Sequence, residues 1–433
     1  MITMSSPYCD FQIFFRGEWR DIHVYEARRP SGVRLFLFSG DFLDAETVYG
    51  PWDQLFSKVF TYSLAVPPFF NALLEKEGKK PEVFHCNDWH SVLCGNLVKR
   101  YFRIPVVYTI HRICRQKIEV DALSREGFSD ILDNKYIKND LFDLELFGAD
   151  YCDALNTVSF SYLNEEWDSF FGNFAGKVTH IWNGIDDSFW NPDFLENPGL
   201  PREERRKRLL AQIGMEDGWL NFYVGRLDAE QKGVDHLLEA VGLILGGCEE
   251  NAGWSGGDLR FVILGSGDPK LAERIAELER QFPSNIKGII GYVKREVTRE
   301  YYASADICVI PSNFEPFGLV QLEAMCLGSI PLGTRVGGIK DTVLDLREWG
   351  QQGTGYLVPP RNGPALAEGM ADLARLLRKN PEFVDKIRRN GRPHVMTNFS
   401  WKKTGQRYLA LYQDRAPMRI PFTRLRERSS EGP

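Results

Sequence analysis

Two glutamates, Glu315 and Glu323, lie in the stretch SNFEPFGLVQLEAM, which follows the short apolar run ADICVIPS. Pro316 suits the first position of a helix, because the N–H that proline lacks is not needed there. We therefore expect a helix to begin at Pro316, with the backbone N–H groups of residues 317–319 pointing out of its start. Such a helix start can bind an anion, and a phosphate is the obvious candidate.

The two glutamates then have alternative roles at this helix. Glu315 would lie just outside the helix start, where its carboxylate either faces a sugar beside the phosphate or only favours the helix dipole. Glu323 would lie about two turns further in. There it either accepts hydrogen bonds from a ribose diol or pairs with a lysine, and the spacing leaves both open.

Two cations follow another apolar run in the segment GRLDAEQKG, namely Arg226 and Lys232. An arginine offers a planar fork of donors and a lysine a compact charge, so together they suit a diphosphate leaving group. The alternative is that both are solvated surface cations. The charged segment PREERRKRLL, by contrast, is expected to be the solvated face of a helix.

Two histidines each follow a strand-like run. His90 ends the segment HCNDWH and would donate a hydrogen bond to a sugar hydroxyl, unless Asp88 is a helix cap beside a half-buried histidine. His111 follows the strand-like run IPVVYTI, so it is expected at the end of a strand, as His90 is.

The elements that position these residues are read from hydrophobic periodicity. Three alternating runs at the start, FQIFF, DIHVYE and VRLFLF, predict antiparallel strands. After about residue 55, short apolar runs alternate with helical segments, which predicts parallel sheets covered by helices. The second half predicts six strands, in WLNFYVGRL, RFVILGSG, IKGIIGY, DICVIPS, SIPLGT and GYLVPP. Ligands of such sheets bind beyond the carboxyl ends of the strands, where the residues above lie.

Composition narrows the class of protein. A chain of 433 residues is long enough for two domains. Its net charge of −6 argues against nucleic-acid binding, and no run approaches the ~18 apolar residues of a membrane span. The eight cysteines form no C-x-x-C pair, so we expect free thiols in the cytoplasm and no zinc site. No D-x-D or P-loop motif occurs, so we expect neither a metal nor another cofactor.

Five segments in order carry a resemblance: HCNDWH, NGIDDSFWNP, VGRLDAEQKG, PSNFEPFGLVQLEAMCLG and RVGGIKDTV. This order resembles the glycogen/starch synthase family of retaining GT-B glycosyltransferases, especially its compact archaeal branch, over about residues 30–400. The resemblance implies an α/β GT-B fold of two Rossmann-like domains. We expect an acceptor-side domain over 1–190, a nucleotide-sugar domain over 191–398, and a C-terminal helix and basic tail over 399–433.

The resemblance also implies roles for single residues. Glu315 matches the catalytic-site glutamate, Arg226 and Lys232 the pair that stabilises the departing diphosphate, and His90 the histidine that contacts the donor sugar. The further donor-binding residues that it implies are Phe317, Gly318, Leu319, Glu323, Gly337, Gly338 and His111.

The activity implied is transfer of glucose, with retention, from ADP-glucose or UDP-glucose to the 4-OH at the non-reducing end of an α-1,4-glucan. One departure from the family pattern is that no Gly–Gly pair precedes Gly246, whereas the family begins with a strand and a K-x-G-G loop. We therefore expect the first domain to be incomplete at its N-terminus and this chain to be a poor synthase. The alternatives are a catalytically impaired nucleotide- or glucan-binding protein, and a GT-B transferase that makes sucrose or trehalose.

Overall fold

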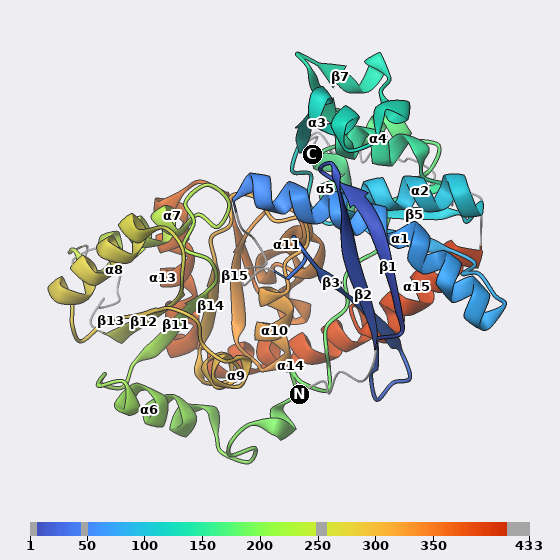
Figure 1. Ribbon diagram of the computed structural model, residues 1–433. Helices are drawn as coiled ribbons and strands as arrows, with labels where there is room; N and C mark the ends of the chain where they lie inside the picture. The colour runs from blue at the N-terminus through green and yellow to red at the C-terminus, as the bar shows by residue number, and fades with distance from the viewer. Residues whose placement is uncertain (1–6, 45–50, 248–257, 414–433) are drawn as a thin grey trace, which may run out of the picture. The chain divides into compact units, whose positions relative to one another are not determined.

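The structure is a computed structural model that describes residues 7–44, 51–247 and 258–413 (Figure 1). Its residues group into two compact units. The first, here the N-terminal unit, comprises Met1–Thr157, Asp168–Thr179 and Leu409–Pro433, and the second, here the C-terminal unit, comprises Val158–Trp167 and His180–Tyr408. The C-terminal unit thus includes a ten-residue segment from within the first half of the sequence, which the predicted boundary at residue 190 does not anticipate.

The N-terminal unit begins with an antiparallel sheet in the order β1-β2-β3, as the alternating runs predicted. Its strands are β1 (Cys9–Phe15), β2 (Glu18–Arg28) and β3 (Arg34–Gly40). One face packs on the long helix α1 (Trp52–Glu77), where the rings of Phe36 and Phe38 lie 4.7 and 5.3 Å from the ring of Phe69. The strand alternation therefore buries one face of this sheet against a helix.

A second sheet of the N-terminal unit has the order β10-β9-β5-β4, with β4, β5 and β9 parallel. Its strands are β4 (Phe84–Asn87), β5 (Val106–Ile110), β9 (Ala154–Thr157) and β10 (Val178–His180). A small sheet of β6 (Lys117–Glu119), β8 (Leu141–Asp143) and β7 (Ile137–Lys138) follows β5 in the chain. The helices of this part are α2 (Val92–Phe102), α3 (Val120–Arg125) and α4 (Leu144–Tyr151).

The C-terminal unit is built on a six-stranded parallel sheet in the order β13-β12-β11-β14-β15-β16. The strands are β11 (Trp219–Val224), β12 (Leu259–Gly265), β13 (Ile286–Ile290), β14 (Ile307–Ile310), β15 (Ile330–Thr334) and β16 (Tyr356–Val358). Five of them lie within the runs predicted as strands, and β12 begins one residue before its run, at Leu259. The strand order reverses between β11 and β14, and the carboxyl ends at such a switch point are the usual ligand site of an open α/β sheet.

Helices cover both faces of this sheet (Figure 1). The helices of this unit are α5 (Phe160–Glu165), α6 (Arg202–Gln212), α7 (Val234–Leu245), α8 (Pro269–Gln281), α9 (Arg295–Ser304), α10 (Val320–Cys326), α11 (Gly337–Thr342), α12 (Leu346–Trp349), α13 (Gly363–Lys379) and α14 (Pro381–Asn398). Helix α15 (Trp401–Gln413) begins in this unit, and its residues from Leu409 on belong to the N-terminal unit. Neighbouring strand residues face opposite helix layers. Phe222 and Cys308 belong to one buried apolar cluster, whereas Tyr223 and Val309 belong to the other. This burial on both faces explains the near-continuous apolar runs.

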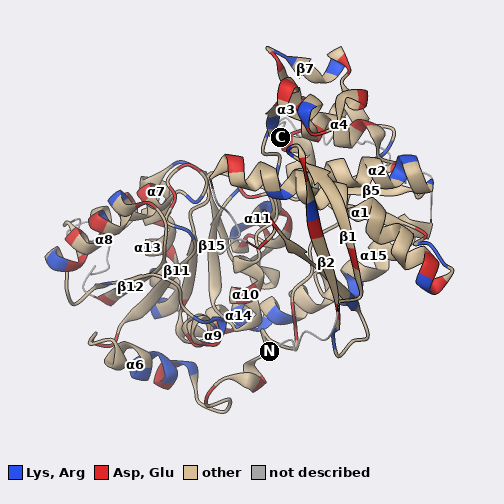
Figure 2. Cartoon of the chain, viewed as in Figure 1, with Lys and Arg blue, Asp and Glu red and all other residues tan. Residues whose placement is uncertain are grey.

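The expectation that the segment PREERRKRLL is the solvated face of a helix holds for Glu203, Glu204, Lys207 and Arg208, which are exposed on α6, but not for Arg205 and Arg206. Blue and red segments alternate along this helix in Figure 2, but Arg205 and Arg206 are each only 6% exposed. The Arg206 guanidinium lies 3.1 Å from the buried carboxylate of Asp306, which also accepts from Arg388 at 2.7 Å. A buried arginine is tolerated where a carboxylate, such as that of Asp306, pairs with it.

In the residues that the structure describes, no helix is long and apolar enough to cross a bilayer.

Candidate active site

A cavity of about 230 Å³ lies at the switch point of the six-stranded sheet, at the carboxyl ends of β11 and β14. Tyr223 and Val224 line it from β11, and Val309 and Ile310 from β14. The polar side chains on its wall come from the segments after these strands; they are Lys232, Ser312, Glu315 and Gln321. The sheet therefore gathers residues that are distant in the sequence onto one cavity.

Lys232 and Glu315 form an ion pair on this wall, with Lys232 Nζ 2.5 Å from Glu315 Oε2. Glu315 is 8% exposed, and the hydroxyl of Ser312 donates a longer hydrogen bond of 3.4 Å to the same oxygen. A buried carboxylate is costly without a partner, so Lys232 compensates the charge of Glu315. The cavity thus presents a cation and a carboxylate side by side.

The turn after Glu315 differs from the expectation. Helix α10 begins at Val320, not at Pro316, because Gly318 has a left-handed φ of 79° that interrupts helical geometry. Gly318 also lies close to a side chain, since a Cβ there would be 2.6 Å from Gln321 Oε1. Glu323 consequently lies in the first turn of α10 rather than two turns into a longer helix.

The predicted anion donors lie in this turn. Within the described ranges, the backbone N–H groups of Phe317, Gly318 and Leu319 donate to no protein acceptor. Gly318 and Leu319 line the cavity, whereas the side chain of Phe317 is 2% exposed and packs in the core. Backbone donors without a protein partner usually bind water or a ligand.

Gly337 and Gly338 lie behind the same turn and have protein acceptors of their own. The N–H of Gly337 donates to Glu165 Oε1 at 2.8 Å, and that of Gly338 donates to the carbonyl of Glu315 at 3.0 Å. A Cβ on Gly337 would lie 1.9 Å from the Glu315 carbonyl oxygen. Their predicted contact with a donor stays a prediction.

Arg226 follows β11 and bonds to residues outside the ion pair. Its side chain is 53% exposed and pairs with Asp228 at 2.7 Å and Gln231 at 2.8 Å. Its backbone carbonyl accepts a hydrogen bond of 2.8 Å from the hydroxyl of Tyr223, which lines the cavity. The structure therefore places Arg226 next to the cavity wall without a contact to Lys232 among the described residues.

Glu323 is half-buried in α10 and accepts a hydrogen bond of 2.8 Å from the hydroxyl of Tyr302. Burial raises the pKa of its carboxyl group to about 7. Glu323 does not line the cavity that holds Glu315. Its role as a ribose ligand stays a prediction.

The two histidines belong to the N-terminal unit. His90 follows β4 in a short 3₁₀ turn and stacks on Trp89 with ring centroids 3.9 Å apart, and burial lowers the pKa of its imidazole. His111 follows β5, where its N–H donates to Asp88 Oδ1 at 2.7 Å and its Nε2 lies 3.0 Å from Asn87 Oδ1. Asp88 thus joins the ends of two neighbouring strands instead of capping a helix by its side chain. The sugar contact of both histidines stays a prediction.

Sequence reasoning missed three polar cavity residues, Ser312, Gln321 and Tyr223. Ser312 and Gln321 lie inside the quoted stretch around Glu315, so their position there was a usable signal. Gln321 is fully buried and its Nε2 donates to the carbonyls of Phe317 and Gly318 at 2.9 Å each, which fixes the turn. Tyr223 gave no signal, because its place within β11 resembles that of any buried strand residue.

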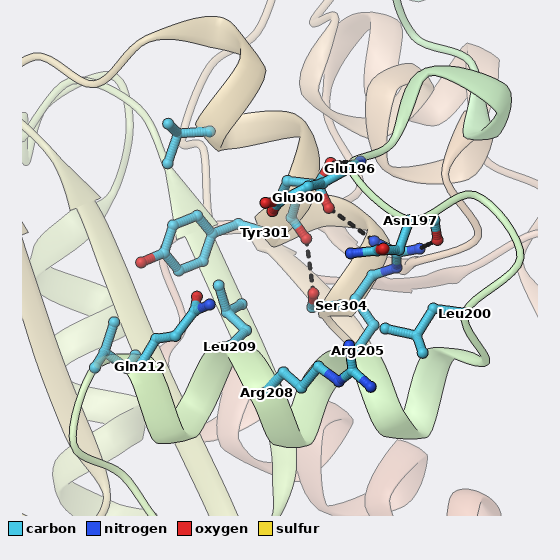
Figure 3. Close-up of a pocket in the computed structure, with 12 residues that line it drawn as sticks. Glu196, Asn197, Leu200, Arg205, Arg208, Leu209, Gln212, Glu300, Tyr301 and Ser304 are labelled. Carbon is cyan, nitrogen blue, oxygen red and sulfur yellow. Dashed lines mark hydrogen bonds and ion pairs between the residues drawn. The ribbon is translucent and has the colours of Figure 1, made fainter.

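A second cavity of about 430 Å³ lies between α6 and α9 (Figure 3). Two of its charged groups bond to each other, with Arg205 2.8 Å from Glu300, and Glu300 also accepts from the backbone N–H of Glu196 at 2.8 Å. These contacts hold α6 against α9, so we assign no chemistry to this cavity.

Across the part of the chain that the structure describes, no cluster of three His, Cys, Asp or Glu side chains is arranged to hold a metal.

Comparisons with known proteins agree with this architecture. Residues 3–180 match the family model described as starch synthase catalytic domain, and residues 220–375 match that described as glycosyl transferases group 1. A glycogen synthase of Lactococcus lactis is 30% identical over 94% of this chain and 87% of its own length. A glycogen synthase of Rhodopseudomonas palustris is 32% identical over 77% of this chain and 72% of its own length.

Two solved structures show the same fold. The catalytic domain of starch synthase IV from Arabidopsis thaliana, bound to ADP and acarbose, has a TM-score of 0.80 at 23% identity and covers 96% of this chain and 88% of its own. A sucrose-phosphate synthase from Thermosynechococcus elongatus has a TM-score of 0.60 at 24% identity, over 90% of this chain and 85% of its own. The fold is therefore α/β GT-B with two parallel-sheet domains, as predicted. The sequence relationships and this fold together place the chain in the glycogen/starch synthase family of glycosyltransferases.

Proposed function

We propose that this chain transfers glucose, with retention, from ADP-glucose or UDP-glucose to the non-reducing end of an α-1,4-glucan. The observation that carries the proposal is the ion pair of Lys232 and Glu315 on a cavity at the switch point of the sheet. Cation and carboxylate are the two groups that glucosyl transfer requires, one for the leaving diphosphate and one for the sugar.

The leaving group would be held by positive groups of this chain. Lys232 lies on the cavity wall and Arg226 next to it, and the N–H groups of residues 317–319 have no protein acceptor among the described residues. Preorganised donors of this kind usually give the largest single contribution to catalysis. A bound diphosphate would share Lys232 with Glu315.

The sugar would lie beside Glu315. As its donor bond breaks, the glucosyl carbon gains positive charge, which the nearby carboxylate stabilises electrostatically. His90 and His111 would donate hydrogen bonds to sugar hydroxyls. Glu323 would accept from the ribose through Oε1, since the Tyr302 hydroxyl donates to Oε2.

The relatives support this assignment of substrates. The starch synthase IV domain was solved with ADP and acarbose, a nucleoside diphosphate and a sugar analogue. The proposal extends both kinds of ligand to this chain. The likeness to the archaeal branch and the cytoplasmic location stay predictions.

The test is incorporation of radiolabelled glucose into glycogen from ADP-glucose and, separately, from UDP-glucose. We expect incorporation with at least one donor, and release of the label by an enzyme specific for α-1,4 links at non-reducing ends. Nucleotide binding without transfer would instead favour the impaired nucleotide- or glucan-binding protein. Transfer only to fructose or glucose phosphates would favour a sucrose- or trehalose-type transferase.

A further inference from the structure

Two short helices of the C-terminal unit bond to each other's first residues. The carboxylate of Asp341 in α11 accepts from the N–H groups of Phe160 and Ser161, at 2.7 and 3.2 Å, where α5 begins. In return, Glu165 at the end of α5 accepts from the N–H of Gly337, where α11 begins, at 2.8 Å. Each helix therefore supplies a carboxylate acceptor for N–H groups at the start of the other helix, where a helix has no acceptor of its own.

The start of α11 is in direct contact with the loop that carries Glu315. The N–H of Gly338 donates to the Glu315 carbonyl at 3.0 Å. A Cβ on Gly338 would lie 2.3 Å from both Cα and the carbonyl oxygen of Phe317, so backbone lies on backbone. A displacement of α11 therefore displaces the peptide units between Glu315 and Phe317.

Helix α5 also reaches this loop directly. The hydroxyl of Ser159, just before α5, donates to the Pro316 carbonyl at 2.5 Å. The ring of Tyr162 meets that of Phe314 edge-on at 5.3 Å, and Tyr162 has no exposed surface. The loop from Phe314 to Phe317 is thus supported from α5 both directly and through α11.

We propose that Glu165 is a positioning residue for Glu315, which it holds in place by anchoring the N–H of Gly337 and with it the start of α11. This inference rests on the proposed function, in which Glu315 faces the reacting sugar. In this role Glu165 acts through the backbone of Gly337. Glu165 is an exposed residue that lies 172 positions from Gly337 in sequence.

The kinetic test compares Glu165→Ala with Glu165→Gln. Glutamine keeps an oxygen that accepts from Gly337, so we expect its kcat to stay within about threefold of the parent. Alanine removes the acceptor, and we expect kcat to fall about tenfold or more while the donor KM changes less than about twofold, because misplaced catalytic groups chiefly cost transition-state stabilisation. Glu273→Ala, on the exposed face of α8 in the same unit, is the matched control.

A double-mutant cycle tests whether Glu165 acts through Glu315. In a Glu315→Gln background we expect Glu165→Ala to have little further effect on kcat, because residues that act as a unit are strongly non-additive. Full additivity would overturn the positioning role.

Amide hydrogen exchange provides a readout that needs no activity. We expect Glu165→Ala, but neither Glu165→Gln nor Glu273→Ala, to speed exchange in residues 312–319 and 337–342 only. If the parent chain transfers no glucose, the proposed function fails, while the exchange result still decides whether Glu165 holds the loop. Unchanged exchange in Glu165→Ala, or faster exchange throughout the C-terminal unit, would overturn the inference.

Discussion

Lys232 Nζ lies 2.5 Å from Glu315 Oε2, although 83 residues separate the two in sequence. Sequence patterns gave them separate tasks, one for a diphosphate and one for a sugar. The structure joins them on one cavity wall, so each charge is stabilised by the other before any ligand binds. Replacing either residue leaves the charge of its partner uncompensated at a mostly buried site.

Lys232→Ala should lower glucosyl transfer by ~10²-fold or more, the effect typical of losing one preorganised donor to developing charge. Arg226→Ala should have an effect of the same order if the exposed guanidinium turns from Asp228 to the diphosphate. Initial rates with saturating donor measure both, together with titration by ADP or UDP, which should bind more weakly. Lys270→Ala and Arg274→Ala, exposed on α8, are the matched controls. Near-parental turnover in either test variant removes that residue from the diphosphate site.

Glu315→Gln and Glu323→Gln should separate the two acids. The first should cripple transfer while leaving nucleotide affinity largely intact, because Glu315 is assigned to the sugar. The second should chiefly weaken nucleotide binding, because Glu323 is assigned to the ribose. Calorimetric titration of each variant with ADP and UDP distinguishes them, and equal losses of affinity would show that the assignment is mistaken.

Glu323 should make the protein less stable as pH rises. Its folded pKa of about 7 lies above the ordinary glutamate value of 4.5, so the folded state holds a proton that the unfolded chain has released. The stability that this proton contributes is full below pH ~4.5 and is lost as pH rises through ~7.

Glu323→Gln should remove this pH dependence while keeping an acceptor for the Tyr302 hydroxyl. Relative to the parent, we expect the free energy of unfolding of the variant to gain up to about 3 kcal/mol between pH 5 and pH 8. Urea unfolding at both pH values measures this. Glu145, whose pKa burial also raises to about 7, contributes equally to both proteins and cancels in the difference. A parallel pH dependence in parent and variant would contradict the assignment.

Gly338→Ala should destabilise the C-terminal unit and reduce transfer. The added methyl group would lie 2.3 Å from the backbone of Phe317, and backbone cannot move aside as a flexible side chain does. We expect a loss of about 2 kcal/mol or more in the free energy of unfolding, as overpacking typically costs 1–3 kcal/mol. Gly242→Ala is the control, because a Cβ there meets nothing within 4 Å in the interior of α7. The control should gain about 0.5–1 kcal/mol. Equal effects of both substitutions would contradict this close packing.

The sequence by itself determined the strands of the C-terminal unit and some of the cavity residues that follow them. Strands β11 and β14 are short apolar runs bounded by turn residues, and this local pattern is set by burial on both faces of a parallel sheet. Because ligands of such sheets gather beyond the carboxyl ends, the pattern alone was enough to identify Lys232, Glu315 and Gly318 as candidates. A helix after Glu315 was also predicted, although it begins at Val320, four residues later than the proline suggested.

Only the tertiary structure decided which of these residues meet. The ion pair of Lys232 with Glu315 depends on β11 and β14 being neighbours, and strand order is not encoded in any local pattern. The same holds for Glu165, whose bond to Gly337 requires a segment from the first half of the chain to pack in the C-terminal unit. Local periodicity reports whether a residue faces a core. It does not report which distant chain segment forms that core, because that is settled by the packing of the whole domain.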